Sequence, residues 1–320
     1  MFGDYVFEKT AAQYTKKMML VDADHLEEKV HYSAVFQAHG FRTVAYTDDL
    51  NFRVNNTSLL NGEGKLAILV QPGVYVPYDI RKKCREEEIS FESLFPKLNS
   101  AVLRESKNLD LELLTLAYQT DFEEYHERKQ TEMFFRRKMY SQKNVEYYLR
   151  DLYECALSQA KSVEDYRAWF EIAEKKATID VTAVEHNVDI DTSELNRAFC
   201  AYAMKNFGKL SSEINLESPV MVSSVMDCIH DHSEKAAIIV MDGMSEFDWT
   251  ILKRSFAGIC YRQSAAFAMI PSTTSISRQC LLSGKYPSQL IEPWKQSKEK
   301  NEFYECARTV SYTHLTLPTT

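Results

Sequence analysis

The 320-residue sequence predicts an α/β protein, and three observations indicate this fold class. Short apolar runs alternate with polar helical stretches over residues 1–100, as in small parallel sheets. Long amphipathic segments rich in Tyr, Glu, Lys and Leu follow over residues 101–220. From residue 221 to 309, two further apolar runs each lead into a polar motif. We therefore expect a small N-terminal α/β domain, a helical middle region and the start of a second α/β domain.

The first domain begins with the run KMMLVDADHL at residues 17–26. FRTVAYTDDL at 41–50 and KLAILVQPGVYVPYD at 65–79 supply two further predicted strands, with a helical stretch before the first of them. Asp22 and Asp24 lie at the end of the first strand, where parallel sheets commonly contact ligands. The position also suits a helix cap, because a carboxylate accepts hydrogen bonds from the first N–H groups of a helix. Of the two roles, we favour capping.

The helical middle region contains DFEEYHERKQTEMFFRRKMYSQKNVEYYLRDLYECALSQA at residues 121–160. Apolar and aromatic residues recur there at spacings of three and four, which predicts helix with an aromatic stripe in the core. Arg136, Arg137 and Lys138 form a small basic cluster among glutamates. We interpret this cluster as a solvated helix face and predict no nucleic-acid site.

Composition limits the possible partners. The formal charge of −8 and pI near 5.6 argue against a general affinity for nucleic-acid backbone or anionic membrane. The seven cysteines occur singly, without the spacing of a disulfide framework, which is typical of a reducing compartment. The sequence contains no leader-like segment and no run of about 18 apolar residues. We expect a cytoplasmic protein without a membrane segment.

The first polar motif of the third region is KAAIIVMDG. The apolar residues 237–241 predict a strand covered on both faces. Such a strand would deliver Asp242 to the ligand-binding edge of a sheet, with Gly243 allowing a sharp turn. Ser245 and Asp248 then predict a capping pair for the next helix.

The second motif is IPSTTSISRQCLLSGKYP at residues 270–287. The run AFAMI at 266–270 predicts a strand ended by Pro271, and the helix that follows is predicted to stop at Gly284. Five hydroxyls gather at the start of this helix: Ser272, Thr273, Thr274, Ser275 and Ser277. Free N–H groups and the helix dipole suit an anion there as well as Ser or Thr caps, so both roles stay open.

Other chemical signals are weak or absent. His230 and His232 flank Asp231, a pair that rarely signals metal by itself. A P-loop is excluded because Gln279 and Tyr286 stand where it needs Gly and Ser or Thr. The chain has no G-x-S-x-G or HExxH motif.

Together, IIVMDGMS and IPSTTSISRQCLLSGKYP resemble the PglZ domain, a branch of the alkaline phosphatase superfamily that occurs in bacterial phage-defence systems of the BREX type. The upstream stretches DADHL, YTDDLNFR and VPYDIRKKCREEEISFESLFPKLN also resemble PglZ-type proteins. The resemblance covers most of residues 17–309. It implies that residues 221–309 begin an alkaline-phosphatase-like α/β domain.

The resemblance implies a metal-dependent phosphoester hydrolase, with a phosphodiester preferred. In this superfamily a Ser or Thr attacks phosphorus, a metal pair, usually zinc, activates it, and the phospho-enzyme is then hydrolysed. Asp242 matches the position of a metal ligand. Related phosphodiesterases show Pro, two residues, Thr, then ten positions to Gly-x-Tyr-Pro, which selects Thr274 as the metal-bound nucleophile. Ser277 replaces an Asn that contacts phosphate in those relatives. Arg278 beside it is a second candidate for phosphate binding, and an exposed salt bridge is an equally open role for it.

The implied metal site is incomplete. The remaining Asp and His ligands of the superfamily follow the nucleophile motif, and residues 285–309 contain neither residue type. We therefore expect half of a two-zinc site, weak zinc binding and little hydrolysis by this chain. Residues 310–320, VSYTHLTLPTT, resemble translated sequencing-adapter DNA, so we expect a non-native tail on a C-terminally truncated fragment.

Two other functions stay open for the chain. One is a non-catalytic scaffold in a defence complex, binding a partner such as a DNA methyltransferase through the middle helices. The other is a sensor for a phosphate-bearing or nucleotide-type ligand, which needs the anion site but no turnover. In the hydrolase function the partner would be a phosphoester or nucleotide-type substrate.

Overall fold

The computed structural model describes residues 1–320 except 214, 216–217, 233–236, 257–260 and 296–320. The side chains of residues 230–232 also lie outside the described part. The chain folds into two compact units, Met1–Tyr148 and the part from Leu149 onward. Residues 101–220, the predicted helical region, contribute to both. The α/β fold class is confirmed by a four-stranded parallel sheet among many helices. The predicted tail, residues 310–320, lies outside the described residues.

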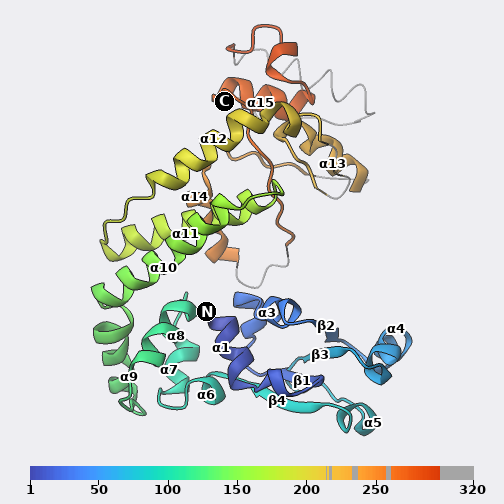
Figure 1. The fold of residues 1–320 in the computed structure, drawn as a ribbon, viewed down its shortest axis with the longest axis vertical. Helices are drawn as coiled ribbons and strands as arrows, with labels where there is room; N and C mark the ends of the chain where they lie inside the picture. The colour runs from blue at the N-terminus through green and yellow to red at the C-terminus, as the bar shows by residue number, and fades with distance from the viewer. Residues whose placement is uncertain (214, 216–217, 233–236, 257–260, 296–320) are drawn as a thin grey trace. The chain divides into compact units, whose positions relative to one another are not determined.

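A parallel sheet forms the centre of the first unit, with its strands side by side in Figure 1 in the order β2-β3-β1-β4. Its strands are β1 (Lys17–Asp22), β2 (Phe41–Tyr46), β3 (Lys65–Val70) and β4 (Arg85–Ile89). The first three were predicted and are confirmed. In the registers, Met19 lies beside Ile68 of β3 and Glu86 of β4. The two central strands are the most apolar, because both of their faces are covered.

This unit also contains the helices α1 (Phe2–Lys9), α2 (Leu26–Val30), α3 (Ser33–Ala38), α4 (Asp49–Asn61), α5 (Tyr78–Arg81), α6 (Phe91–Leu94), α7 (Ser100–Glu105), α8 (Leu111–Thr120) and α9 (Arg128–Phe134). Phe2, Tyr5, Phe95 and Tyr118 stack in the core between α1, α6 and α8. This aromatic packing ties the N-terminal helix to residues ninety or more positions away.

The helix predicted over residues 121–160 is confirmed only from Arg128 onward. Residues before Arg128 are mostly irregular, and a π-helical turn at Phe135–Met139 separates α9 from α10 (Gln142–Lys161). Asp121 explains the irregular start, because it accepts hydrogen bonds from Glu123 N–H and Tyr125 Oη and pairs with Lys138 at 2.9 Å. The predicted aromatic core is confirmed by buried Phe134 and Tyr148.

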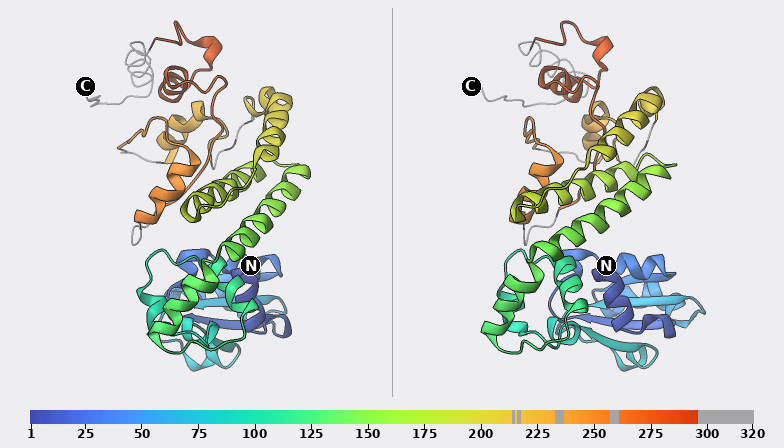
Figure 2. Two further views of the ribbon diagram at one scale, coloured as in Figure 1. Left: turned by 90° about the vertical axis from the view of Figure 1, so that its left-hand side faces the viewer. Right: turned by 60° about the vertical axis from the view of Figure 1, so that its left-hand side comes forward.

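The second unit is built on helices. The part of α10 from Leu149 onward and α11 (Ala168–His186) run side by side as a helical hairpin (Figure 2). Gln159 Nε2 of α10 donates to Glu171 of α11 at 2.8 Å. The unit's other helices are α12 (Ser193–Leu210), α13 (Val225–His232), α14 (Glu246–Leu252) and α15 (Thr274–Ser283). Trp169, Leu195, Met221 and Cys280 belong to one buried apolar cluster. This cluster holds α15 against the helical hairpin.

Both strands predicted for the second unit are wrong. Residues 237–241 form no strand and are exposed, with Ile239 88% exposed. The 266–270 run carries a single parallel bridge, from Phe267 to Met221. A strand requires a ladder of hydrogen bonds with a neighbour, and the described residues of this unit supply no such neighbour. Phe267 and Met269 are nevertheless buried, so the second run still packs as core.

Candidate active site

Asp242 and α15 lie together, although the strand predicted to position Asp242 is not formed. Arg278 Nη1 is 3.3 Å from Asp242 Oδ2, and the two residues are 36 positions apart in the chain. Gly243 has a φ of +70°, the left-handed turn for which glycine was predicted. Ser245 then caps α14 by accepting from Asp248 N–H at 3.2 Å, and Asp248 accepts in return from Ser245 N–H at 3.0 Å. The predicted capping pair is confirmed.

The hydroxyl-rich run places Thr274 at the first position of α15. Thr273 is the N-cap residue, but its side chain makes no capping hydrogen bond. Gly284 ends the helix with a φ of +69°, as the sequence predicts. Thr274, Ser277 and Arg278 are spaced by three and four residues, so they share one face of α15. Since Arg278 contacts Asp242, the carboxylate lies at this same face.

The opposite face of α15 fixes the helix. Cys280 is fully buried in the apolar cluster, and Gln279 Nε2 donates to the carbonyls of Ser275 at 3.0 Å and Pro293 at 2.9 Å. After the helix, the Tyr286 hydroxyl donates to the Ser211 carbonyl at the end of α12. These contacts leave Thr274, Ser277 and Arg278 only partly buried and facing away from the core.

A zinc site is not complete among the described residues. No group of three or more His, Cys, Asp or Glu side chains there is arranged to hold a metal ion. A zinc ion needs at least three protein ligands, and Asp242, the carboxylate that contacts α15 in the described part of the chain, pairs with Arg278. The residues present therefore do not fit zinc by themselves. His230 and His232 end α13, and their side chains lie outside the described residues.

The two carboxylates that end β1 have structural roles. Asp22 caps α2, accepting from Leu26 N–H at 2.8 Å and Glu27 N–H at 2.7 Å, so the capping role is confirmed. Burial raises its pKa, although these two N–H groups act to lower it. Asp24 accepts from Phe91 N–H at 2.7 Å and Arg104 Nε at 2.6 Å. Burial opposes the lowering of the Asp24 pKa, but the hydrogen bonds from Arg104 and Phe91 prevail.

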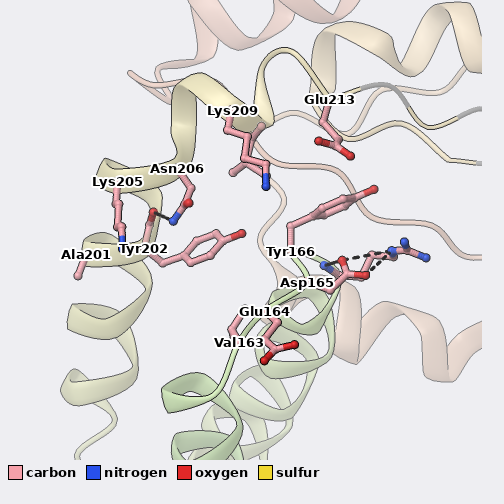
Figure 3. Close-up of a pocket in the computed structure, with 12 residues that line it drawn as sticks. Val163, Glu164, Asp165, Tyr166, Ala201, Tyr202, Lys205, Asn206, Lys209 and Glu213 are labelled. Carbon is pink, nitrogen blue, oxygen red and sulfur yellow. Dashed lines mark hydrogen bonds and ion pairs between the residues drawn. The ribbon is translucent and has the colours of Figure 1, made fainter.

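A pocket of about 650 Å³ lies in the second unit and was not predicted (Figure 3). It is lined by residues of the α10–α11 loop, including Tyr166, and by Tyr202, Lys205 and Lys209 of α12. The spacing of Tyr202, Lys205 and Lys209 places them on one helix face, which is the signal available in the sequence. Tyr166, on the opposite side of the pocket, belongs to the α10–α11 loop. The spacing along α12 therefore could not predict that a pocket forms between them.

Comparison with known proteins assigns the chain to no family. No family model matches the chain, and no curated protein matches it. Among the described residues, no helix combines the length and the apolar character needed to cross a bilayer.

Proposed function

We propose that the chain carries a PglZ-type phosphoester hydrolase site, with Thr274 as nucleophile, Asp242 as metal-ligating carboxylate, and Ser277 and Arg278 as contacts for phosphoryl oxygens. One observation supports this most: Arg278 joins Asp242 to the Thr274 face of α15 at 3.3 Å. Two motifs that are separate in sequence thus supply a hydroxyl, a guanidinium and a carboxylate to one place. A phosphoester is the substrate class that uses all three.

In the proposed reaction, Thr274 Oγ1 bonds to phosphorus while the ester bond to the leaving alcohol breaks. The first-turn N–H groups of α15 and the Arg278 guanidinium stabilise the negative phosphoryl oxygens. Water then cleaves the phosphothreonine. A divalent metal pair, which the resemblance implies, would lower the pKa of the attacking hydroxyl when bound. Its remaining ligands are not among the described residues.

The test is hydrolysis of a chromogenic phosphodiester, with excess zinc or manganese, by the chain extended with the ligand-bearing region that the resemblance implies, because the described residues hold no complete zinc site. Thr274→Ala and Asp242→Asn are each expected to lower turnover by about a hundredfold or more, since nucleophile and ligand act in the transition state. Thr273→Ala is the matched control, because this neighbouring hydroxyl caps nothing. Undiminished hydrolysis by Thr274→Ala would sink the assignment.

The second candidate is phosphate binding without turnover, which needs only the start of α15 and Arg278, both present in the structure. A defence-complex scaffold that binds a partner such as a DNA methyltransferase would be one non-catalytic form. Vanadate or inorganic phosphate binding, measured by calorimetry, separates the two candidates. Binding that depends on Arg278, with no metal-dependent hydrolysis, supports the sensor or scaffold over the enzyme.

A further inference from the structure

The pocket beside α12 has the dimensions of a small-molecule site. Its volume of about 650 Å³ falls within the usual range for ligand pockets. One wall is the loop at 162–167, between α10 and α11, and the other is the C-terminal half of α12. In Figure 3 the Tyr202 ring and the Lys209 amine point into the space between these walls.

Two aromatic rings give the pocket flat apolar surfaces. Tyr202 packs against Trp169 with ring centroids 5.3 Å apart, which fixes its orientation from behind. Tyr166 packs against Phe267 at 6.2 Å, and its hydroxyl accepts from Asn215 Nδ2 at 3.1 Å. Both rings are partly buried and are held in place without a ligand. Preorganised aromatic faces suit a flat heteroaromatic ring.

The pocket also offers two ammonium groups that form no ion pair with a described residue, although carboxylates line it as well. Lys205 and Lys209 lie one turn apart on the same face of α12, and neither forms an ion pair with a described residue. Across the pocket, Arg167 is already paired with Asp165 at 3.1 Å. Two ammonium groups beside aromatic faces favour a ligand that carries an anion on a ring system.

We propose that this pocket binds a purine nucleoside monophosphate, with the base against Tyr166 and Tyr202 and the phosphate at Lys205 and Lys209. The exposed carboxylates of Glu164 and Glu213 at the rim can accept hydrogen bonds from ribose hydroxyls or an exocyclic amine. This site is separate from the Thr274 face of α15. It does not depend on the proposed hydrolase function.

Calorimetry with AMP and GMP on the full chain tests the proposal. We expect saturable binding of at least one of them, with adenosine or guanosine and inorganic phosphate each binding about tenfold or more weakly. Lys205→Glu and Lys209→Glu are each expected to weaken nucleotide binding by about tenfold or more, since each replaces an attractive charge by a repulsive one. Tyr202→Leu, which removes the stacking face, should also weaken it by about tenfold.

Arg197→Glu is the matched control, because it makes the same charge change on an exposed residue of α12 outside the pocket. It should change the affinity less than about twofold. Circular dichroism confirms that each variant is folded. The proposal is overturned if neither nucleotide binds at about 1 mM, or if inorganic phosphate binds as tightly as AMP and GMP. Nucleotide binding that is lost in Arg278→Ala but kept in Lys209→Glu would place the ligand at α15 and overturn it as well.

Discussion

The Arg278 guanidinium lies 3.3 Å from the Asp242 carboxylate, with both side chains more than a third exposed. Exposed ion pairs add little to stability, so this pair is not what holds α15 in place. Arg278→Ala should change the free energy of unfolding in urea by less than about 1 kcal/mol. In the proposed site, however, it should weaken vanadate or phosphate binding by about tenfold or more, with partial recovery in Arg278→Lys.

A purely structural Arg278 would give the opposite result. Stability would then fall in Arg278→Ala, and anion binding by the remaining folded protein would be unchanged. Measuring both quantities on one preparation therefore distinguishes the two roles.

Tyr46 is buried at 3% exposure, and its hydroxyl finds no hydrogen-bond partner among the residues described. Because an unsatisfied buried hydroxyl is costly, Tyr46→Phe should leave stability unchanged or raise it by about 1 kcal/mol. Tyr5→Phe is the matched comparison, since the Tyr5 hydroxyl donates to the Leu94 carbonyl. That substitution should lower stability by about 1 kcal/mol. Equal losses in both variants, measured by urea unfolding, would contradict this contrast.

The Asp24–Arg104 pair predicts acid sensitivity. The pKa of Asp24 is lowered in the folded state, so its contribution is complete above the unfolded pKa near 3.9 and is lost as pH falls through the folded value. Asp24→Asn should therefore flatten the fall in unfolding free energy below about pH 4. The pKa of Asp22 is raised instead, but Asp22 is present in both the parent protein and Asp24→Asn, so its effect cancels when their pH profiles are compared.

Removing the partner tests the same pair at neutral pH. The Asp24 side chain is only 8% exposed, so Arg104→Ala leaves a buried carboxylate with one remaining donor and should cost about 1–3 kcal/mol. Arg128→Ala is the control, because Arg128 and Glu105 form an exposed pair. Its urea midpoint should stay close to that of the parent protein. Similar losses of stability in Arg104→Ala and Arg128→Ala would contradict the importance of the burial of Asp24.

Gly284 ends α15 with a φ of +69°, and a Cβ there would meet only ordinary contact, 3.6 Å from the Ser223 carbonyl oxygen. Gly284→Ala should therefore cost about 1 kcal/mol from backbone strain alone. Gly208→Ala, inside α12 with open space around the site, should instead stabilise by about 0.5–1 kcal/mol. Thermal and urea unfolding measure whether each substitution lowers or raises the stability of the folded protein. A neutral Gly284→Ala would mean that the helix end relaxes to another conformation.

Local signals in the sequence predicted the first unit well. The strands β1, β2 and β3 are apolar runs that stand out from their flanks, and they form the expected parallel sheet. β4 was missed because its sequence, REEEI, is charged. At the sheet edge its charged side chains remain largely in solvent, and pairing with β1 determines its conformation.

The candidate site was predicted less evenly. Helix ends, the Ser245 cap and the glycine turns follow from local chemistry, and these predictions hold. The run at 237–241 was predicted to be a buried strand because of its apolar composition, but strand formation depends on a neighbour that sequence periodicity does not reveal. The contact of Arg278 with Asp242 is tertiary, and neither residue's local sequence indicates it.

The exposed run at residues 237–241 also has a consequence for handling the protein in solution. It combines β-branched residues with no charge and no proline, the composition that favours intermolecular strand pairing and aggregation. We expect concentration-dependent self-association, relieved by Ile239→Lys at its most exposed position and hardly changed by Val184→Lys, an exposed site on α11. Light scattering compares the parent protein and the two variants at matched concentrations. Equal scattering by Ile239→Lys and Val184→Lys would mean that another surface causes the self-association. An apolar run that the sequence predicts to be a buried strand is thus expected to limit solubility.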